Sequence, residues 1–125
     1  MRSDMKRLLA AAAIALVSSV ASAQAVTVTL TEFKMALSKD TVQAGAVTFK
    51  VTNSGQMSHG LYVRGPGVAK GTREIAKGEA ASLTVTLTAG EYDVYCPLAD
   101  GSHRQAGMSK KLVVVDGAPS KKPNL

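Results

Sequence analysis

Apolar and polar residues alternate with a period of two along much of the chain after residue 24. Successive side chains of a β-strand point to opposite faces of the sheet, so this alternation predicts strands with one buried face. Many positions hold Val or Thr, whose branched side chains favour strands further. The clearest segments are VTVTLT (26–31), VTFKVT (47–52), LTVTLT (83–88), EYDVYC (91–96) and KKLVVV (110–115).

Turn signals separate these segments, for example Asn53-Ser54-Gly55 and Arg64-Gly65-Pro66-Gly67. Weaker strands are expected over 33–37 and 60–63, and a short helical turn within 69–76. No segment after residue 24 has the pattern of a long amphipathic helix. Short strands with frequent turns predict an all-β fold, a two-sheet Greek-key antiparallel β-sandwich.

The first 23 residues have the pattern of a secretory signal peptide rather than of a folded element. Basic residues precede a ten-residue apolar run at 8–17, and Ala21-Ser22-Ala23 is a small-x-small cleavage pattern. The run is about half the length of a membrane span. We therefore expect cleavage after Ala23 and export to the periplasm, with an uncleaved anchor as the alternative.

The rest of the chain is expected to form one domain over 24–117, followed by a flexible tail at 118–125. Residues 24–125 keep 12 basic and 8 acidic residues, a formal charge of +4, compared with +6 for the whole sequence. The basic residues are scattered and aromatic residues are few, which argues against nucleic-acid binding. A mildly basic surface would instead favour an acidic protein partner.

Cys96 is the only cysteine of the sequence, so it has no partner for an internal disulfide. It continues the inward-facing series of Tyr92 and Val94, which predicts a sulfur that points into the sandwich. Such a thiol is either buried and inert, paired between chains, or bound to something else. The loop that follows contains His103 and returns to the next strand at Met108.

Both histidines of the sequence lie in predicted loops, His59 after one strand and His103 after another. Loops at one end of a Greek-key sandwich cluster together, so His59, Cys96, His103 and Met108 could meet there. A thiolate and two imidazoles with a distant thioether form the blue-copper arrangement. Zinc could also bind one Cys and two His, but it has no need of the Met and carries no electron.

These residues resemble those of the small cupredoxins, the plastocyanin, azurin and pseudoazurin type of blue copper protein. NSGQMSH is similar to the family's Asn-x-Gly-x-x-x-His loop, and LTAGEYDVYCPLADGSHRQAGM to its Cys strand and ligand loop. The resemblance implies a cupredoxin domain and a type-1 site for one Cu(I)/Cu(II) ion. It makes His59 and His103 the imidazole ligands, Cys96 the thiolate and Met108 the axial thioether.

Two departures from the family pattern concern the surroundings of the copper. Six residues, PLADGS, separate Cys96 from His103, more than in most small members. Gly60 follows His59 where many members have Asn or Ser as a tie to the Cys loop. Because such partners orient ligands and tune the metal, the reduction potential cannot be carried over from the family.

Other residues near the predicted site are open to two interpretations. Met57 is either a packing residue or an additional soft ligand or rim residue. Arg104 either steers a partner or is simply solvated. Tyr92 and Tyr95 are expected to be packing residues, and Met35 to lie in the core.

The predicted function is that of a periplasmic one-electron carrier, without enzyme activity because four protein ligands leave the copper no open position. We expect a monomer that docks to a cytochrome, oxidase or reductase and does not insert stably into a membrane. The first alternative is a copper carrier or storage protein without redox turnover. The second is a β-sandwich that binds no metal.

Overall fold

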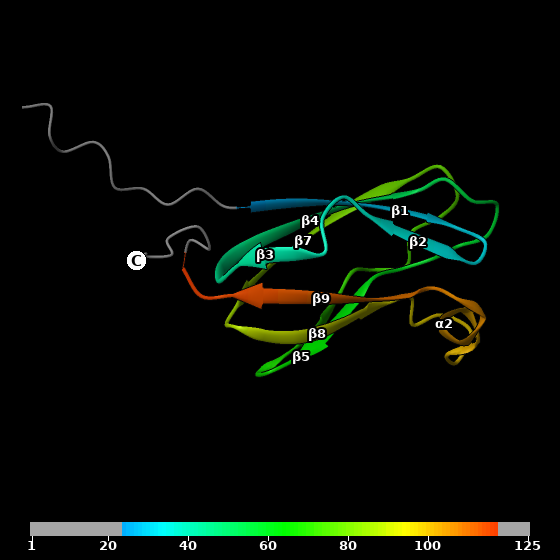
Figure 1. Cartoon of the computed structure of the whole chain (residues 1–125). Helices are drawn as coiled ribbons and strands as arrows, with labels where there is room; N and C mark the ends of the chain where they lie inside the picture. Colours follow the sequence, from blue (N-terminus) through cyan, green and yellow to red (C-terminus); the bar gives the residue numbers. More distant parts are fainter. Residues whose placement is uncertain (1–23, 118–125) are drawn as a thin grey trace, which may run out of the picture.

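The protein is described by a computed structural model over residues 24–117, which form two facing β-sheets (Figure 1). One sheet has the strand order β2-β1-β4-β7, and the other has the order β3-β9-β8-β5-β6. The elements are β1 (Gln24–Thr31), β2 (Lys34–Leu37), β3 (Thr41–Gln43), β4 (Gly45–Asn53), β5 (Tyr62–Gly65), β6 (Val68–Gly71), β7 (Ala80–Leu87), β8 (Gly90–Tyr95), α2 (Ser102–Ala106) and β9 (Ser109–Val115). The predicted all-β, two-sheet sandwich is confirmed.

Both sheets are mixed rather than purely antiparallel. β1 pairs in parallel with β4, from Gln24 opposite Val47 to Leu30 opposite Asn53, and β3 pairs in parallel with β9. The other pairs are antiparallel. The cause is that the chain leaves the first sheet after β2, adds β3 to the second sheet, and returns as β4.

The apolar faces of the predicted strands form the core between the sheets. The apolar face of each sheet is removed from water by packing against that of the other sheet. The inward series of β1, β4 and β8 is confirmed. Its buried members are Val26, Val28, Leu30, Val47, Phe49, Val51, Tyr92, Val94 and Cys96. Met35 is also buried, as expected. Tyr95 lies on the outer face of β8 by its parity, yet it is buried too.

The weaker parts of the sequence pattern gave less accurate predictions. The helical turn expected within 69–76 is wrong, because β6 (Val68–Gly71) pairs there with β5 and extends the second sheet. The strand expected over 60–63 begins later, at Tyr62, and the strand expected over 33–37 begins at Lys34. The short strand β3 and the helix α2 were not predicted.

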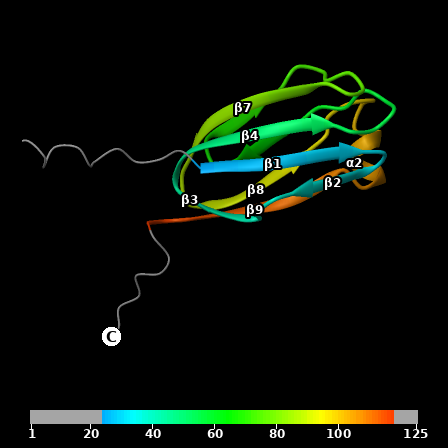
Figure 2. The ribbon, with the colours of Figure 1, turned by 90° about the horizontal axis from the view of Figure 1, so that it is seen from above.

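The loops that hold the candidate ligands gather at one end of the sandwich. Figures 1 and 2, which view the molecule at right angles, both place α2 and the β1–β2 turn at this end. The expected signal peptide (1–23) and tail (118–125) lie outside the described residues. Within the described part of the chain, the helix is too short to cross a membrane.

Candidate metal centre

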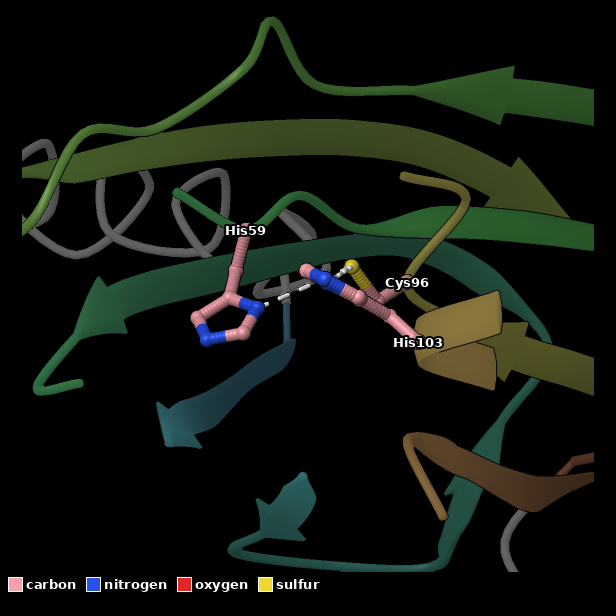
Figure 3. Close-up of side chains that lie close together, drawn as sticks. All are labelled: His59, Cys96 and His103. Carbon is pink, nitrogen blue, oxygen red and sulfur yellow. Dashed lines mark hydrogen bonds between the residues drawn. The ribbon is translucent and has the colours of Figure 1, made fainter. Parts of the chain in front are cut away.

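His59, Cys96 and His103 meet at this end of the sandwich, as the sequence predicted (Figure 3). The Cys96 Sγ atom lies 3.9 Å from His59 Nδ1 and 3.8 Å from His103 Nδ1. The three donor atoms are within 4.8 Å of one another. His59 and Cys96 are fully buried, whereas His103 keeps 7% of its surface exposed. A thiol and two imidazoles from three separate segments therefore form one pocket for an ion.

Met108 lies beside this group, where the chain returns to the second sheet. Its side chain is fully buried. The Cys96 N–H donates to the Met108 carbonyl oxygen over 3.1 Å, and the Met108 N–H donates to the His103 carbonyl oxygen over 3.2 Å. These bonds fix the start of β9 against the end of β8. The loop closure predicted from the sequence is thus present, and it brings the Met108 backbone next to those of Cys96 and His103.

The long PLADGS segment forms a tight turn that leads into α2. Ala99, Asp100 and Gly101 all have positive φ angles, so the backbone winds back on itself before the helix begins. α2 then presents His103 toward the sulfur. Gly107 ends the helix with a φ of +136°, and a Cβ there would collide with the Phe33 carbonyl oxygen at 2.7 Å. Only glycine fits at this position.

The His59 loop is tied to the sandwich by backbone pairing and by one buried amide. His59 and Ile75 exchange backbone hydrogen bonds of 3.1 and 2.8 Å. The Asn53 side chain donates to the carbonyl oxygens of Met57 and Ile75 over 2.8 and 2.9 Å, and it accepts from the Gly55 N–H over 2.9 Å. Since Asn53 is fully buried, these bonds satisfy an amide that would otherwise be costly to bury.

Glu32, in the β1–β2 turn, is a residue of the site that sequence reasoning missed. Its Oε2 atom lies 2.9 Å from His59 Nε2. The carboxylate also accepts from the backbone N–H groups of Gln56 and Met57 over 2.9 to 3.0 Å. The Gln56 and Met57 bonds, with a smaller contribution from His59, lower the pKa of Glu32 to about 2. Glu32 is therefore ionised at neutral pH.

The carboxylate determines which nitrogen of the His59 ring carries the proton and which keeps its lone pair. An ionised carboxylate only accepts hydrogen bonds, so His59 Nε2 must carry a proton. In the neutral imidazole, Nδ1 then keeps its lone pair and points at Cys96. No local sequence pattern marks Glu32, because it stands 27 positions before His59 in the β1–β2 turn. Only the fold brings the two together.

The His59 loop is held in place although Gly60 has no side chain. A Cβ at Gly60 would find its nearest neighbours at 3.7 Å, on Arg73, Pro97 and Thr72, so a small side chain would fit. The next residue, Leu61, exchanges hydrogen bonds with Thr72 instead. Glu32, Asn53 and the 72–75 segment thus hold the His59 loop, although none of them belongs to the Cys96 loop to which many family members tie this position.

Arg104, next to the ligand candidate His103, is neither free nor simply solvated. Its guanidinium lies over the Tyr95 ring, 3.8 Å from the centroid, and 3.7 Å from the Asp93 carboxylate. Tyr95 directly precedes Cys96 at the end of β8, so this stacking joins α2, which carries His103, to the strand that leads to Cys96. Lys111 also pairs with Asp93 at 2.9 Å. We therefore interpret Arg104 as a loop clamp.

Two apolar side chains are exposed beside the centre. Phe33 is 37% exposed, and its ring lies edge-on to His103 with the centroids 5.2 Å apart. Met57 is 45% exposed, so the interpretation as a packing residue is wrong. Its backbone is held by Glu32 and Asn53, so this exposed residue has a fixed place two positions before His59.

The residues present fit a type-1 copper ion. A soft sulfur donor and two imidazole nitrogens face one another, with a second buried sulfur from Met108 nearby. Both imidazoles turn the same type of nitrogen, Nδ1, toward the sulfur. Copper is accordingly the cofactor of this centre. The individual bonds from His59, Cys96, His103 and Met108 to the ion stay a prediction.

Comparisons with solved structures support the fold. Auracyanin from the photosynthetic bacterium Roseiflexus castenholzii is 16% identical with a TM-score of 0.59, covering 78% of this chain and 99% of that one. Auracyanin A, a "blue" copper protein from Chloroflexus aurantiacus, is 19% identical with a TM-score of 0.57, covering 74% and 99%. The copper nitrite reductase of Nitrosomonas europaea is 16% identical with a TM-score of 0.63, covering 82% of this chain but 45% of the enzyme.

Sequence identities this low show only the fold, whereas a match to a family model assigns the chain to a family. No curated protein matches the sequence. The model of the cupredoxin-like domain, however, matches residues 6–114, which is most of the chain. The match includes all four predicted ligands and both sheets of the sandwich. This chain belongs to the cupredoxin-like domain family.

Proposed function

We propose that this protein is a one-electron carrier that works through a type-1 copper centre. The observation that carries the proposal is the enclosure of the donor set. His59, Cys96 and Met108 are fully buried, and His103 alone reaches the surface, at 7% exposure. Bound copper would supply reversible exchange of one electron between Cu(II) and Cu(I). The protein would contribute a dry site whose donors are already gathered.

The same enclosure supports a carrier rather than an enzyme. Catalytic metal sites keep one position open for water or substrate. Here a thiolate, two imidazoles and a thioether would fill the surroundings of the ion. Related folds do occur within enzymes, as in the copper nitrite reductase, but this chain spans about half the length of that enzyme. We therefore propose that the chain has no enzyme activity of its own.

The site's surroundings indicate where electrons would enter and leave. His103 is the one ligand candidate with exposed surface, and Phe33 packs edge-on against it. A redox partner that covers Phe33 would approach the centre through the His103 ring. The formal charge of +4 on residues 24–125 favours a partner with an acidic docking face. We propose a monomeric protein, exported to the periplasm, that meets a cytochrome, oxidase or reductase there.

The exposed Met57 favours a second candidate function, that of a copper carrier. Thioethers bind Cu(I), and Met57 offers one at the surface two residues from His59. A Cu(I) ion leaving the centre could pass this side chain on its way to a partner. In that case the protein would release its metal on reduction instead of retaining it.

Redox cycling in the presence of a strong Cu(I) chelator separates the two functions. The copper-loaded protein is reduced and reoxidised repeatedly, and the visible absorption and bound copper are measured after each cycle. An electron carrier keeps about one copper per chain and regains its colour each time, because the ligands are enclosed. Loss of copper during the first reductions, slowed in Met57→Leu, would contradict the proposal and support the copper carrier.

A further inference from the structure

Glu32 gathers hydrogen-bond donors from the loop that contains His59. Its carboxylate accepts from the backbone N–H groups of Gln56 and Met57 and lies 2.9 Å from His59 Nε2. Glu32 itself belongs to the β1–β2 turn, which is 27 residues away in sequence. Its side chain is 26% exposed, whereas that of His59 is fully buried. The carboxylate thus links two separate segments at the ring of a ligand candidate.

The position of the carboxylate excludes it from the ligand group. Oε2 bonds to His59 Nε2, while the other ring nitrogen, Nδ1, faces Cys96. Figure 3 shows this ring with Nδ1 turned toward the sulfur and Nε2 turned away from it. Glu32 is also absent from the cluster of donor atoms within the described residues. Any effect of Glu32 on the metal must therefore pass through His59 or through its charge.

The chain also leaves space for this carboxylate. A Cβ at Gly55 would overlap both carboxylate oxygens of Glu32. The Gly55 N–H is held by the buried Asn53 side chain, which keeps this backbone where it is. The absence of a side chain at residue 55 and the two converging amides of residues 56 and 57 form a niche for an anion. Glu32 occupies it with a specific orientation toward His59.

We propose that Glu32 is a positioning residue of the copper centre. It holds the His59 ring so that the lone pair of Nδ1 is free to bind the metal, and it places a fixed negative charge behind this ligand. A carboxylate that accepts from the outer nitrogen of a ligating histidine fixes the ring and makes its donor atom more basic. A negative charge near the site favours the more positive ion, so it stabilises Cu(II) relative to Cu(I). The effect on the metal rests on the proposed function, whereas the effect on His59 does not.

Nitrogen NMR of the His59 ring in the metal-free protein tests the positioning role. The wild type is expected to show the proton on Nε2. Glu32→Gln should keep this tautomer, because an amide oxygen can replace Oε2 as the acceptor. Glu32→Ala should populate the Nδ1–H form, since Nε2 would lose its carboxylate acceptor while Nδ1–H could donate to Cys96 Sγ. Gly55→Ala, which displaces the carboxylate without removing it, should have the same effect.

The reduction potential of the copper-loaded protein tests the role of the charge. Glu32→Gln should raise the potential by about 59 mV, equivalent to a tenfold gain in the preference for Cu(I). Glu91→Gln removes the same charge from an exposed site in β8, where Glu91 is 4.0 Å from Lys111, and should leave the potential nearly unchanged. Circular dichroism establishes that each variant is folded.

Each measurement has a result that overturns its part of the proposal. An unchanged His59 tautomer in Glu32→Ala and Gly55→Ala would refute the positioning role. A potential in Glu32→Gln equal to that of Glu91→Gln would refute the role of the charge. A protein that binds no copper would contradict the proposed function instead, and the NMR result would still decide whether Glu32 positions His59.

Discussion

Replacing Cys96 by serine is expected to abolish the intense visible absorption of the copper-loaded protein. That absorption would arise from charge transfer between a thiolate and Cu(II), which a hydroxyl group cannot supply. The substitution is nearly isosteric and lies at a fully buried position, so the fold should tolerate it. Visible spectroscopy after addition of Cu(II) measures the effect, and the band should disappear rather than weaken.

Met108→Leu provides the matched comparison for Cys96→Ser. It also replaces a fully buried sulfur-containing side chain, and leucine fills a similar volume. Because the thiolate remains, this variant should stay coloured, with a shifted band or potential. If Cys96→Ser keeps the full colour of the wild type, the thiolate is not a ligand and the type-1 assignment fails.

Asn53→Ala is expected to lower the free energy of unfolding by about 3 kcal/mol, since buried groups left without partners cost about 1–3 kcal/mol each. The variant would leave the Met57 carbonyl oxygen and the Gly55 N–H without their partner, and it would remove one of the two hydrogen bonds to the Ile75 carbonyl oxygen, which keeps the His59 N–H. Partial relaxation of the exposed loop should keep the loss of unfolding free energy below the sum of the costs of the separate groups. Urea denaturation of the metal-free protein measures it. Copper affinity should fall as well, because the His59 loop loses its anchor.

Thr84→Ala is the control for this effect. The Thr84 hydroxyl bonds to that of Thr48 over 2.8 Å, but on an exposed face of the sheet. Water can replace the lost bond, so the change should stay below about 1 kcal/mol. An equal and small loss in Asn53→Ala would show that the buried amide does not hold the loop.

The long strands could be predicted from the sequence because their burial is periodic. In β1, for instance, Val26, Val28 and Leu30 are buried while Thr27 and Thr29 are more exposed. The same parity places the Cys96 sulfur inside. Once Cys96 and Met108 were assigned to the two ends of one loop, the sheet had to bring them close. These inferences need only local patterns and the period of a strand.

Features that depend on distant partners could not be predicted in this way. β6 has a weak pattern with one half-buried apolar residue, Val68, and it exists because β5 pairs with it. The parallel pairing of β1 with β4 follows from the path of the chain between the sheets. Glu32 has no local signature either, since its role is defined by its contact with His59. The signal peptide and the tail lie outside the described residues and stay predictions.

Titration of the unsubstituted, metal-free protein with Cu(II) tests the central claim most directly. The gathered His59, Cys96 and His103 donors predict an intense blue or green absorption that grows in proportion to added copper. The increase should end at one equivalent per chain, because these residues form a single enclosed centre. Failure of an intense band to appear by one equivalent would contradict a type-1 copper site.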